Sequence, residues 1–340
     1  MIRSYGLHWR LEGVDIPSPN HYSTFGATGG PVSMLNNNVL ANSDFITGAF
    51  PAEYGNALSG VFDLKMRNGN NEKHEFLGQI GFNGFELGAE GPISKKNGSS
   101  YLISGRYSTL EVMSSMGMDF GTGTAIPKYK DLTFKLNFPK TKIGRISVFG
   151  IGGISNIAFK DSERDPDEAV EDQDLYSGEL SDLTNGADMA TIGMNHTCLF
   201  NDHSYGKASI AYSYHYSHTD IDTLPALGEE PHPFLRQNFI EQKLFASYFV
   251  SKKFNTQHEI KSGIIFNHRI FDLKDSVYDK PQQQFVDMHD NEGSVQSLQP
   301  YVNWHYKISD NLVMNTGLHY LHFLYNDSYS IEPRWNLKWA

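Results

Sequence analysis

Histidine is the residue type best suited to binding a metal or moving a proton near neutral pH, and this 340-residue chain has 14 of them. His258 and Glu259 would open the helical motif of a zinc protease, in which a second histidine follows four residues after the first. Position 262 is Ser, so the second metal ligand is missing. The sequence therefore indicates no zinc-protease site.

A second group of metal-binding side chains crowds the end of one expected strand: His215, His218, Asp220 and Asp222. Residues 215 and 218 would point to opposite faces of that strand, so only the loop beyond could gather the group. Hydrophilic strand-end residues are the simpler interpretation. The chain also lacks the spacing of glycine-rich phosphate loops and the serine-centred elbow of hydrolases. We expect no enzyme activity, no cofactor and no resident metal.

A short polar stretch, Asn20, His21 and Tyr22, comes directly after two closely spaced prolines, Pro17 and Pro19. The prolines predict an extended, exposed loop. The three side chains are then either ordinary loop residues or an apex that faces a ligand.

The composition favours strands and restricts the partners. Aromatic residues make up 13% of the chain and there are 31 glycines, which favours an all-β protein. A net charge of −11 argues against a nucleic-acid partner, because phosphate binding needs clustered Lys and Arg. No run approaches 18 apolar residues, although barrel strands cross a bilayer with only about 9–11 alternating residues. The single cysteine, Cys198, can form no internal disulfide and does not decide the compartment.

From residue 74 onward the sequence alternates between apolar and polar residues. The clearest case sets Leu132, Phe134 and Leu136 against Thr133 and Lys135. We predict strands at 74–82, 100–108, 131–137, 143–160, 189–201, 203–222, 238–254, 258–273, 298–308 and 312–325, with an eleventh ending near 339.

The connections between these strands alternate in length. Tight turns are expected at 140–141, 201–202, 254–255 and 309–310, and long loops at 108–127, 161–187, 222–235 and 274–296. Short turns at one end and long loops at the other are typical of outer-membrane β-barrels. A two-sheet sandwich has the same alternation, but soluble strands average only about 5–6 residues, shorter than most of these.

Residues 29–69 are built differently, with short β-prone pieces separated every few residues by Gly, Pro and Asn turns. Such a stretch has too little apolar surface to fold alone. We therefore expect it to be held inside the structure that the long strands build.

Three motifs in this stretch resemble the second half of the plug domain of TonB-dependent outer-membrane receptors. They are residues 29–36 (Gly-Gly-Pro-Val-Ser-Met-Leu-Asn), 50–60 (Phe-Pro-Ala-Glu-Tyr-Gly-Asn-Ala-Leu-Ser-Gly) and 62–67 (Phe-Asp-Leu-Lys-Met-Arg). The similar branch of the family carries a carboxypeptidase-regulatory-like domain before its plug. Residues 101–108 resemble the second barrel strand of that branch, and Glu332-Pro333-Arg334 resembles the opening of a later strand.

The resemblance implies an all-β fold in two parts: the C-terminal part of a plug domain at 1–70, and an incomplete transmembrane antiparallel β-barrel at 71–340. Family barrels have about 22 strands, and about ten or eleven are expected here. Closing such a barrel would take about 550 residues, so we expect a fragment that lacks the signal peptide, the TonB-coupling segment and the first half of the plug.

The resemblance also implies a location in the outer membrane, in contact with its lipid, and two kinds of partner. One is the TonB energy-transducing complex, and the other is an extracellular ligand, which in this family is a small molecule, a glycan or a peptide. Asn20, His21 and Tyr22 would contact the ligand.

Other residues would hold the plug in the barrel. On the plug these are Glu53, Tyr54 and Arg67, and on the barrel wall Arg106 is the expected partner, with Lys135 and Lys307 as further candidates. Polar contacts suit this task because water can replace them one at a time.

The alternative function is a soluble or surface-attached β-sandwich that binds carbohydrate or protein through its aromatic residues. Its best support is the stripe formed by Tyr212, Tyr214 and Tyr216. A passive porin is excluded, because it would carry no plug segment.

Overall fold

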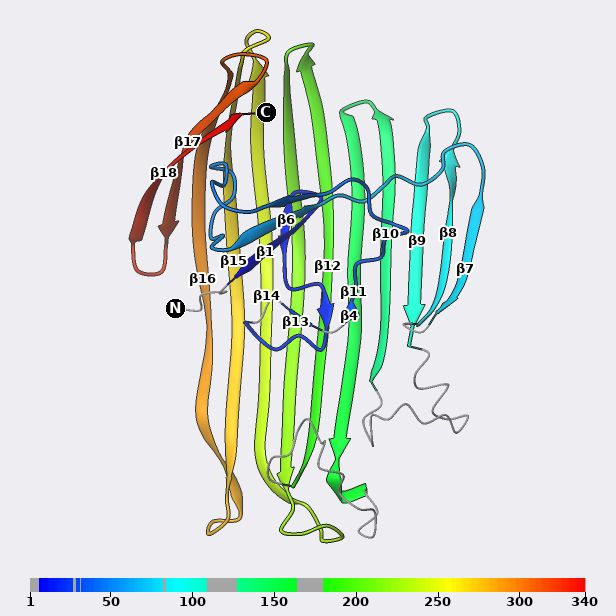
Figure 1. Cartoon of the computed structure of the whole chain (residues 1–340), viewed down its shortest axis with the longest axis vertical. Helices are drawn as coiled ribbons and strands as arrows, with labels where there is room; N and C mark the ends of the chain where they lie inside the picture. The colour runs from blue at the N-terminus through cyan, green and yellow to red at the C-terminus, as the bar shows by residue number, and fades with distance from the viewer. Residues whose placement is uncertain are drawn as a thin grey trace.

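The computed structural model describes residues 6–26, 29–30, 32–81, 84–108, 127–163 and 180–339. These residues form two parts (Figure 1). Residues 6–73, here called the N-terminal segment, contain short strands joined by turns, and residues 75–339 form one curved antiparallel sheet, here called the large sheet. The segment lies across one face of the large sheet.

The large sheet has twelve strands, each paired with its neighbours in chain order. They are β7 (Glu75–Gly81), β8 (Gly84–Ser94), β9 (Ser99–Tyr107), β10 (Lys128–Thr141), β11 (Gly144–Lys160), β12 (Ser181–Asn201), β13 (Ser204–Thr223), β14 (His232–Lys253), β15 (His258–Asp279), β16 (Gln284–Lys307), β17 (Leu312–Phe323) and β18 (Ser328–Trp339). Within the described residues β7 and β18 are not paired with each other, so the sheet is unclosed. A short 3-10 turn, η1 (Asp161–Glu163), follows β11.

The N-terminal segment has a four-stranded sheet in the order β2-β1-β6-β5. Its strands are β1 (Leu7–Leu11), β2 (Val14–Ile16), β5 (Asp44–Ile46) and β6 (Gly60–Leu64), and a separate pair joins β3 (Asn20–His21) to β4 (Val32–Ser33). β1 and β2 are connected by Glu12 and Gly13, whose φ angles of 57° and 88° are the left-handed pair that a two-residue hairpin turn requires.

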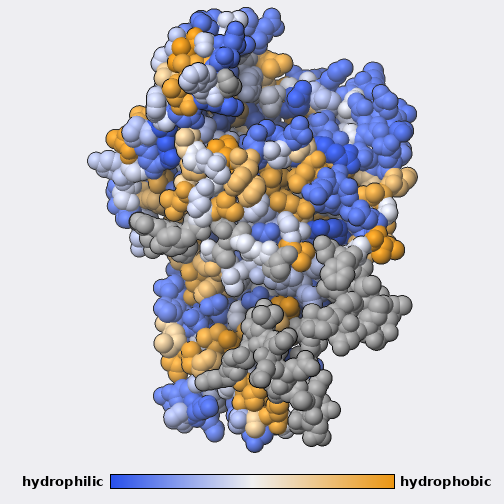
Figure 2. All heavy atoms as spheres, viewed as in Figure 1, coloured by the Kyte–Doolittle hydropathy of each residue, from blue (hydrophilic) through white to orange (hydrophobic). Residues whose placement is uncertain are grey.

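The two faces of the large sheet are the reverse of those in a soluble protein. On β10 the polar residues Asp131, Thr133 and Lys135 are buried beneath the N-terminal segment, whereas Leu132 on the opposite face is 49% exposed. The same reversal recurs along the sheet, with buried Ser104, Thr191, Asn195, Ser213, Asn267 and Gln299, and exposed Ile103, Ile154, Ile192, Ile210, Leu244, Ile264, Val302 and Leu318. On the side that carries the segment, hydrophilic and hydrophobic residues are intermixed (Figure 2).

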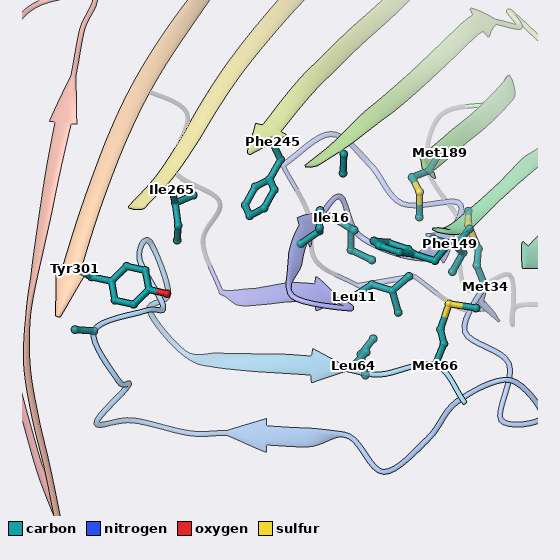
Figure 3. Close-up of a cluster of buried hydrophobic side chains, with 14 residues drawn as sticks. Leu11, Ile16, Met34, Leu64, Met66, Phe149, Met189, Phe245, Ile265 and Tyr301 are labelled. Atoms are coloured by element: carbon teal, nitrogen blue, oxygen red, sulfur yellow. The ribbon is translucent and has the colours of Figure 1, made fainter. Parts of the chain in front are cut away.

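The main apolar cluster is shared between the two parts (Figure 3). The segment contributes Leu11, Ile16, Met34, Leu64 and Met66, and the large sheet contributes Phe149, Met189, Phe245, Ile265 and Tyr301. Burying each such side chain stabilises the folded protein by about 1.5–3 kcal/mol. A smaller cluster of Phe50, Tyr54 and Val61 belongs to the segment itself. The segment therefore depends on the large sheet for about half of its main apolar cluster.

The predicted fold class, an all-β partial barrel, is confirmed, and the structure adds one strand to the eleven predicted. The additional strand is β8, whose alternation is broken by Gly88, Gly91 and Pro92. Among the described residues no helix is long and apolar enough to cross a membrane.

The predicted long loops are shorter than expected. Residues 274–279 and 284–296 belong to β15 and β16, so the prediction of a loop at 274–296 was wrong. β12 begins at Ser181 and β14 at His232. These stretches carry polar residues on both faces, so they have no apolar period to reveal a strand. The loop at 108–127 lies almost wholly outside the described residues.

Candidate functional site

The surface between the N-terminal segment and the large sheet holds most of the buried polar groups. Its first contact point is the tip of the β1–β2 turn. The Glu12 carboxylate accepts hydrogen bonds from Lys135 Nζ at 2.9 Å and from the Met66 main-chain N–H at 2.7 Å. The main-chain oxygen of Glu12 accepts two more, from Asn195 Nδ2 at 3.0 Å and Lys207 Nζ at 2.8 Å. Side chains from β10, β12 and β13 thus fix one turn.

The second contact point is a buried group centred on Asp131. Its Oδ2 lies 2.9 Å from Nε2 of His21, and its two oxygens accept Arg106 Nε at 3.0 Å and Nη2 at 2.7 Å. Arg106 Nη2 also donates to the main-chain oxygen of Ser33 at 2.5 Å. His21 is fully buried and its ring lies 4.6 Å from that of Tyr129. A buried carboxylate is stable only when it is paired, and removing Asp131 would leave the partly buried Arg106 guanidinium without its main ion-pair partner.

The third contact point is a two-pronged ion pair between Arg67 and Glu90. Arg67 Nη1 and Nη2 donate to the two Glu90 oxygens at 2.7 and 2.8 Å. Arg67 Nε donates to the main-chain oxygen of Asn38 at 2.5 Å, and the Asn70 N–H donates to Glu90 at 2.7 Å. Paired parallel hydrogen bonds of this kind fix orientation as well as charge.

A neighbouring carboxylate, Glu86 on β8, binds two asparagines of the segment. Asn36 Nδ2 donates to Glu86 at 2.6 Å, and Asn38 Nδ2 donates at 3.1 Å. Ser104 Oγ donates to the same carboxylate at 2.9 Å. Glu86 is buried, so these donors replace the water that it would otherwise bind.

At the other end of the large sheet, residues 49–55 of the segment bind β15 to β18. Glu53 forms an ion pair with Lys261. The Ala52 N–H donates to Asn303 Oδ1 at 2.7 Å, and His319 Nδ1 donates to the Ala52 oxygen at 2.7 Å. A β-carbon at Gly55 would lie 2.5 Å from Gln299 Oε1, so a larger residue would have to displace the Gln299 and His319 side chains.

Charged groups also lie buried inside the segment. His8 and Arg10 contact Asp15 at 3.0 and 3.3 Å. Burial alone would raise the pKa of Asp15, but His8, Arg10 and Lys243 of the large sheet hold it well below its ordinary value. The Arg10 guanidinium also stacks 4.8 Å from the centre of the Tyr54 ring.

The structure places the predicted residues as follows. Glu53, Arg67 and Arg106 lie at contacts between the two parts, whereas the Tyr54 hydroxyl donates to Asp63 within the segment at 2.8 Å. Lys135 lies at the Glu12 contact, whereas Lys307 pairs with Asp310 in a turn.

The predicted ligand residues lie close to the wall of the large sheet. Asn20 and His21 are buried, and the Tyr22 N–H donates to Ser155 Oγ on β11 at 2.9 Å. Ligand contact by Asn20, His21 and Tyr22 stays a prediction. Within the described residues, no group of three or more His, Cys, Asp or Glu could hold a metal ion.

The sequence predictions missed the carboxylates that receive these contacts: Glu12, Glu86, Glu90 and Asp131. Glu86 and Glu90 lie on β8, the strand that was not predicted. Asp131 was placed correctly on a polar face, but its partner His21 lies 110 residues away in the chain. The sequence offered one signal for these contacts: a charged residue on the polar face of a barrel strand is a candidate partner for the segment.

Comparison with solved structures identifies the fold. The fold is that of the TonB-dependent outer-membrane receptors, so the predicted resemblance is confirmed. By sequence alone the chain matches no protein-family model and no curated protein.

Three of the similar structures illustrate the match. The copper transporter OprC superposes with a TM-score of 0.64 at 10% identity over 97% of this chain and 51% of that one. The pyoverdine outer membrane receptor FpvA of Pseudomonas aeruginosa PAO1 gives 0.67 at 11% identity, over 99% and 52%. The siderophore receptor PirA of Acinetobacter baumannii gives 0.64 at 15%, over 98% and 51%. At these identities the likeness establishes the fold, and the chain spans about half the length of the structures that it matches.

The sandwich alternative is not favoured. A sandwich buries its apolar faces between two sheets. Here the apolar face of the large sheet is the exposed one, and the face covered by the segment is largely polar. Tyr212 lies on the exposed face, where its hydroxyl donates to Gln242 at 2.8 Å.

Proposed function

We propose that this chain is part of an outer-membrane receptor that takes up an extracellular ligand by active, TonB-dependent transport. Residues 1–70 are the C-terminal part of its plug, and residues 71–340 supply the first half of its barrel. The proposal rests on one observation above all: the large sheet exposes apolar side chains on one face and buries polar ones beneath the segment on the other. Lipid outside and a polar plug inside account for both faces.

The contacts of the segment suit an element that must move. Hydrogen bonds and ion pairs to a polar wall can be exchanged for bonds to water at small net cost once movement of the segment lets water in. Several of the contacts are separate groups, such as Arg67–Glu90 and Glu53–Lys261, which can open one after another. A pull by the TonB complex would therefore release the plug stepwise, while the strand ladder of the barrel stays intact.

The ligand would approach from the end of the large sheet where the long connections lie. Asn20, His21 and Tyr22 are the proposed contact residues, because β4, the partner strand of β3, lies on the part of the segment nearest that end (Figure 1). The structural neighbours named above are receptors and transporters, which is in keeping with transport and not with catalysis.

A cysteine-accessibility experiment on the complete outer-membrane protein tests the proposal. Thr133→Cys places a thiol beneath the segment, where Thr133 is 3% exposed, in a background with Cys198→Ser. We expect a membrane-impermeant thiol reagent to label this position in cells with an active TonB complex and not in cells without one. Leu132→Cys, which faces the lipid, is the matched control and should show no TonB dependence.

Two results would contradict the proposal. One is equal labelling of Thr133→Cys with and without TonB. The other is recovery of the protein in the soluble fraction instead of as a heat-modifiable band in the outer membrane.

A further inference from the structure

One strand of the large sheet extends far beyond its neighbour. β16 has 24 residues, but β17 has 12 and pairs with β16 only from Ser297 to Lys307. The last main-chain hydrogen bond between β16 and the chain that leaves β17 runs from the Leu324 N–H to the Gln296 oxygen, at 3.0 Å. Figure 1 shows β16 continuing well past the β17–β18 hairpin.

Residues 284–295, here called the β16 edge, therefore have a strand partner on one side only. On that side β15 pairs with them from Asp279↔Gln284 to Arg269↔Val295. On the other side, no residue in the described part of the chain pairs with them. In an antiparallel sheet every second residue of such a strand directs its N–H and C=O away from the partner, so the β16 edge presents a row of unused hydrogen-bonding groups.

The β17–β18 hairpin does not cover this edge. β17 turns back into β18 after only four residues, 324–327, and β18 lies on the far side of β17.

The charge of the β16 edge selects the chemistry of a partner. The stretch carries Asp287, Asp290 and Glu292 and contains no Lys or Arg. Lys274 Nζ of β15 lies 3.2 Å from Asp287 Oδ2 and 3.6 Å from Asp290 Oδ2, so one ammonium group forms ion pairs with two carboxylates. Glu292 is exposed and forms no ion pair within the described residues. The edge is thus acidic.

Apolar side chains alternate with these charges. Val286 is 40% exposed and Met288 is 61% exposed. Phe285 is partly covered by Arg236, whose guanidinium lies 5.3 Å from the centre of the ring. A strand lying along the edge would meet both carboxylates and apolar surface, which suits a chain that alternates basic and apolar residues.

We propose that the β16 edge binds an extended basic polypeptide as an additional strand of the sheet. Main-chain hydrogen bonds would supply the affinity, and the carboxylates would select the charge. A second copy of this chain is disfavoured as the occupant, because antiparallel self-pairing would set the three carboxylates of each copy opposite the same acidic stretch. We take this polypeptide to be extracellular, and that part of the inference rests on the proposed function.

The test uses the complete protein in detergent micelles and a synthetic 12-residue peptide of alternating Lys and Val. We expect this peptide to bind and to slow amide hydrogen exchange within 284–295. Two control peptides isolate the interactions: one has N-methyl groups at every second residue and cannot form the strand ladder, and the other has Glu in place of Lys. Neither should bind.

The double variant Asp290→Lys, Glu292→Lys should weaken binding of the Lys-Val peptide by several-fold to about tenfold, because it replaces two attractive charges by two repulsive ones. The same variant should gain affinity for the Glu-Val peptide. Both positions are exposed, and an unchanged heat-modifiable band would verify that the variant folds.

Three results would overturn the proposal. Equal binding of the N-methylated peptide would show charge attraction without strand addition. Slow exchange of residues 284–295 in the free protein would show an edge that is already covered, and protection that grows with protein concentration would identify a second copy as the occupant. None of these results affects the TonB-dependent labelling of Thr133→Cys, so the two proposals can fail separately.

Discussion

The N-terminal segment and the large sheet are both made of strands, but they are stabilised in different ways. The strands of the large sheet are 7 to 24 residues long and pair with their neighbours along the sheet. The strands of the segment have 2 to 5 residues, and side chains of the large sheet supply half of the main apolar cluster that covers them. The hydrogen-bond ladder of the sheet does not depend on the segment, whereas the segment depends on the sheet.

This asymmetry is what a movable plug in a fixed barrel requires. Displacing the segment exposes the shared cluster and breaks the polar contacts, but it breaks no hydrogen bond between neighbouring strands of the large sheet. The difference can be tested by substitutions that affect one part and spare the other.

The largest effect is expected from Asp131→Ala. The substitution leaves the partly buried Arg106 without its main partner and removes the partner of the buried His21, which should destabilise docking of the segment by about 3 kcal/mol. Limited proteolysis of the purified protein should cut within residues 6–73 much faster, while the heat-modifiable barrel band remains. Lys130→Ala, at the exposed neighbouring position, is the control. Undiminished protease resistance of the segment would contradict the stated role of Asp131.

Leu132→Arg tests the opposite face of the same strand. A charge on the lipid side should destabilise insertion of the barrel by about 2–4 kcal/mol near the middle of the bilayer. The measurement is the denaturant midpoint for unfolding of the protein in lipid vesicles. Leu132→Ile should leave that midpoint nearly unchanged. If Leu132→Arg is as stable as the native protein, this face does not contact lipid.

The next effect concerns a contact at the margin of the segment. Arg67→Glu replaces the paired hydrogen bonds to Glu90 by repulsion, and because Arg67 is 38% exposed we expect a cost of only about 1–2 kcal/mol. Passive leakage of a small dye through the barrel should rise. Lys65→Glu, which disrupts an exposed pair with Asp44, should change leakage little. Unchanged leakage in Arg67→Glu would count against a plug-retaining role.

The fold could be predicted from the sequence where one face of a strand is apolar. β10 shows a period of two because one of its faces carries exposed apolar side chains and the other carries polar side chains beneath the segment. β8 could not be predicted, because Gly88, Gly91 and Pro92 interrupt the period, and the outer part of β16 could not either, because water reaches both of its faces.

The candidate site was less predictable. Polar residues such as Arg106 and Lys135 could be assigned to the inner face, but their partners are fixed by how the segment lies in three dimensions. Glu12 is the clearest example. It contacts Lys135 from a turn in which its own φ is positive, and a single sequence carries no signal for that contact.

The smallest effect is a dependence of docking on acid, and it comes from Asp15. His8, Arg10 and Lys243 lower the pKa of Asp15 in the folded state against the effect of burial. A lowered folded pKa stabilises the docked segment above the unfolded pKa of about 3.9, and this contribution is lost as the pH falls below that value. Between pH 6 and pH 3 the loss from this one group should be about 1 kcal/mol. Asp15→Asn should weaken docking at pH 6 and flatten the acid dependence, as measured by hydrogen exchange of β1 and β2 in the complete protein. An identical pH profile in the variant and the native protein would show that Asp15 is not the group that couples docking to pH.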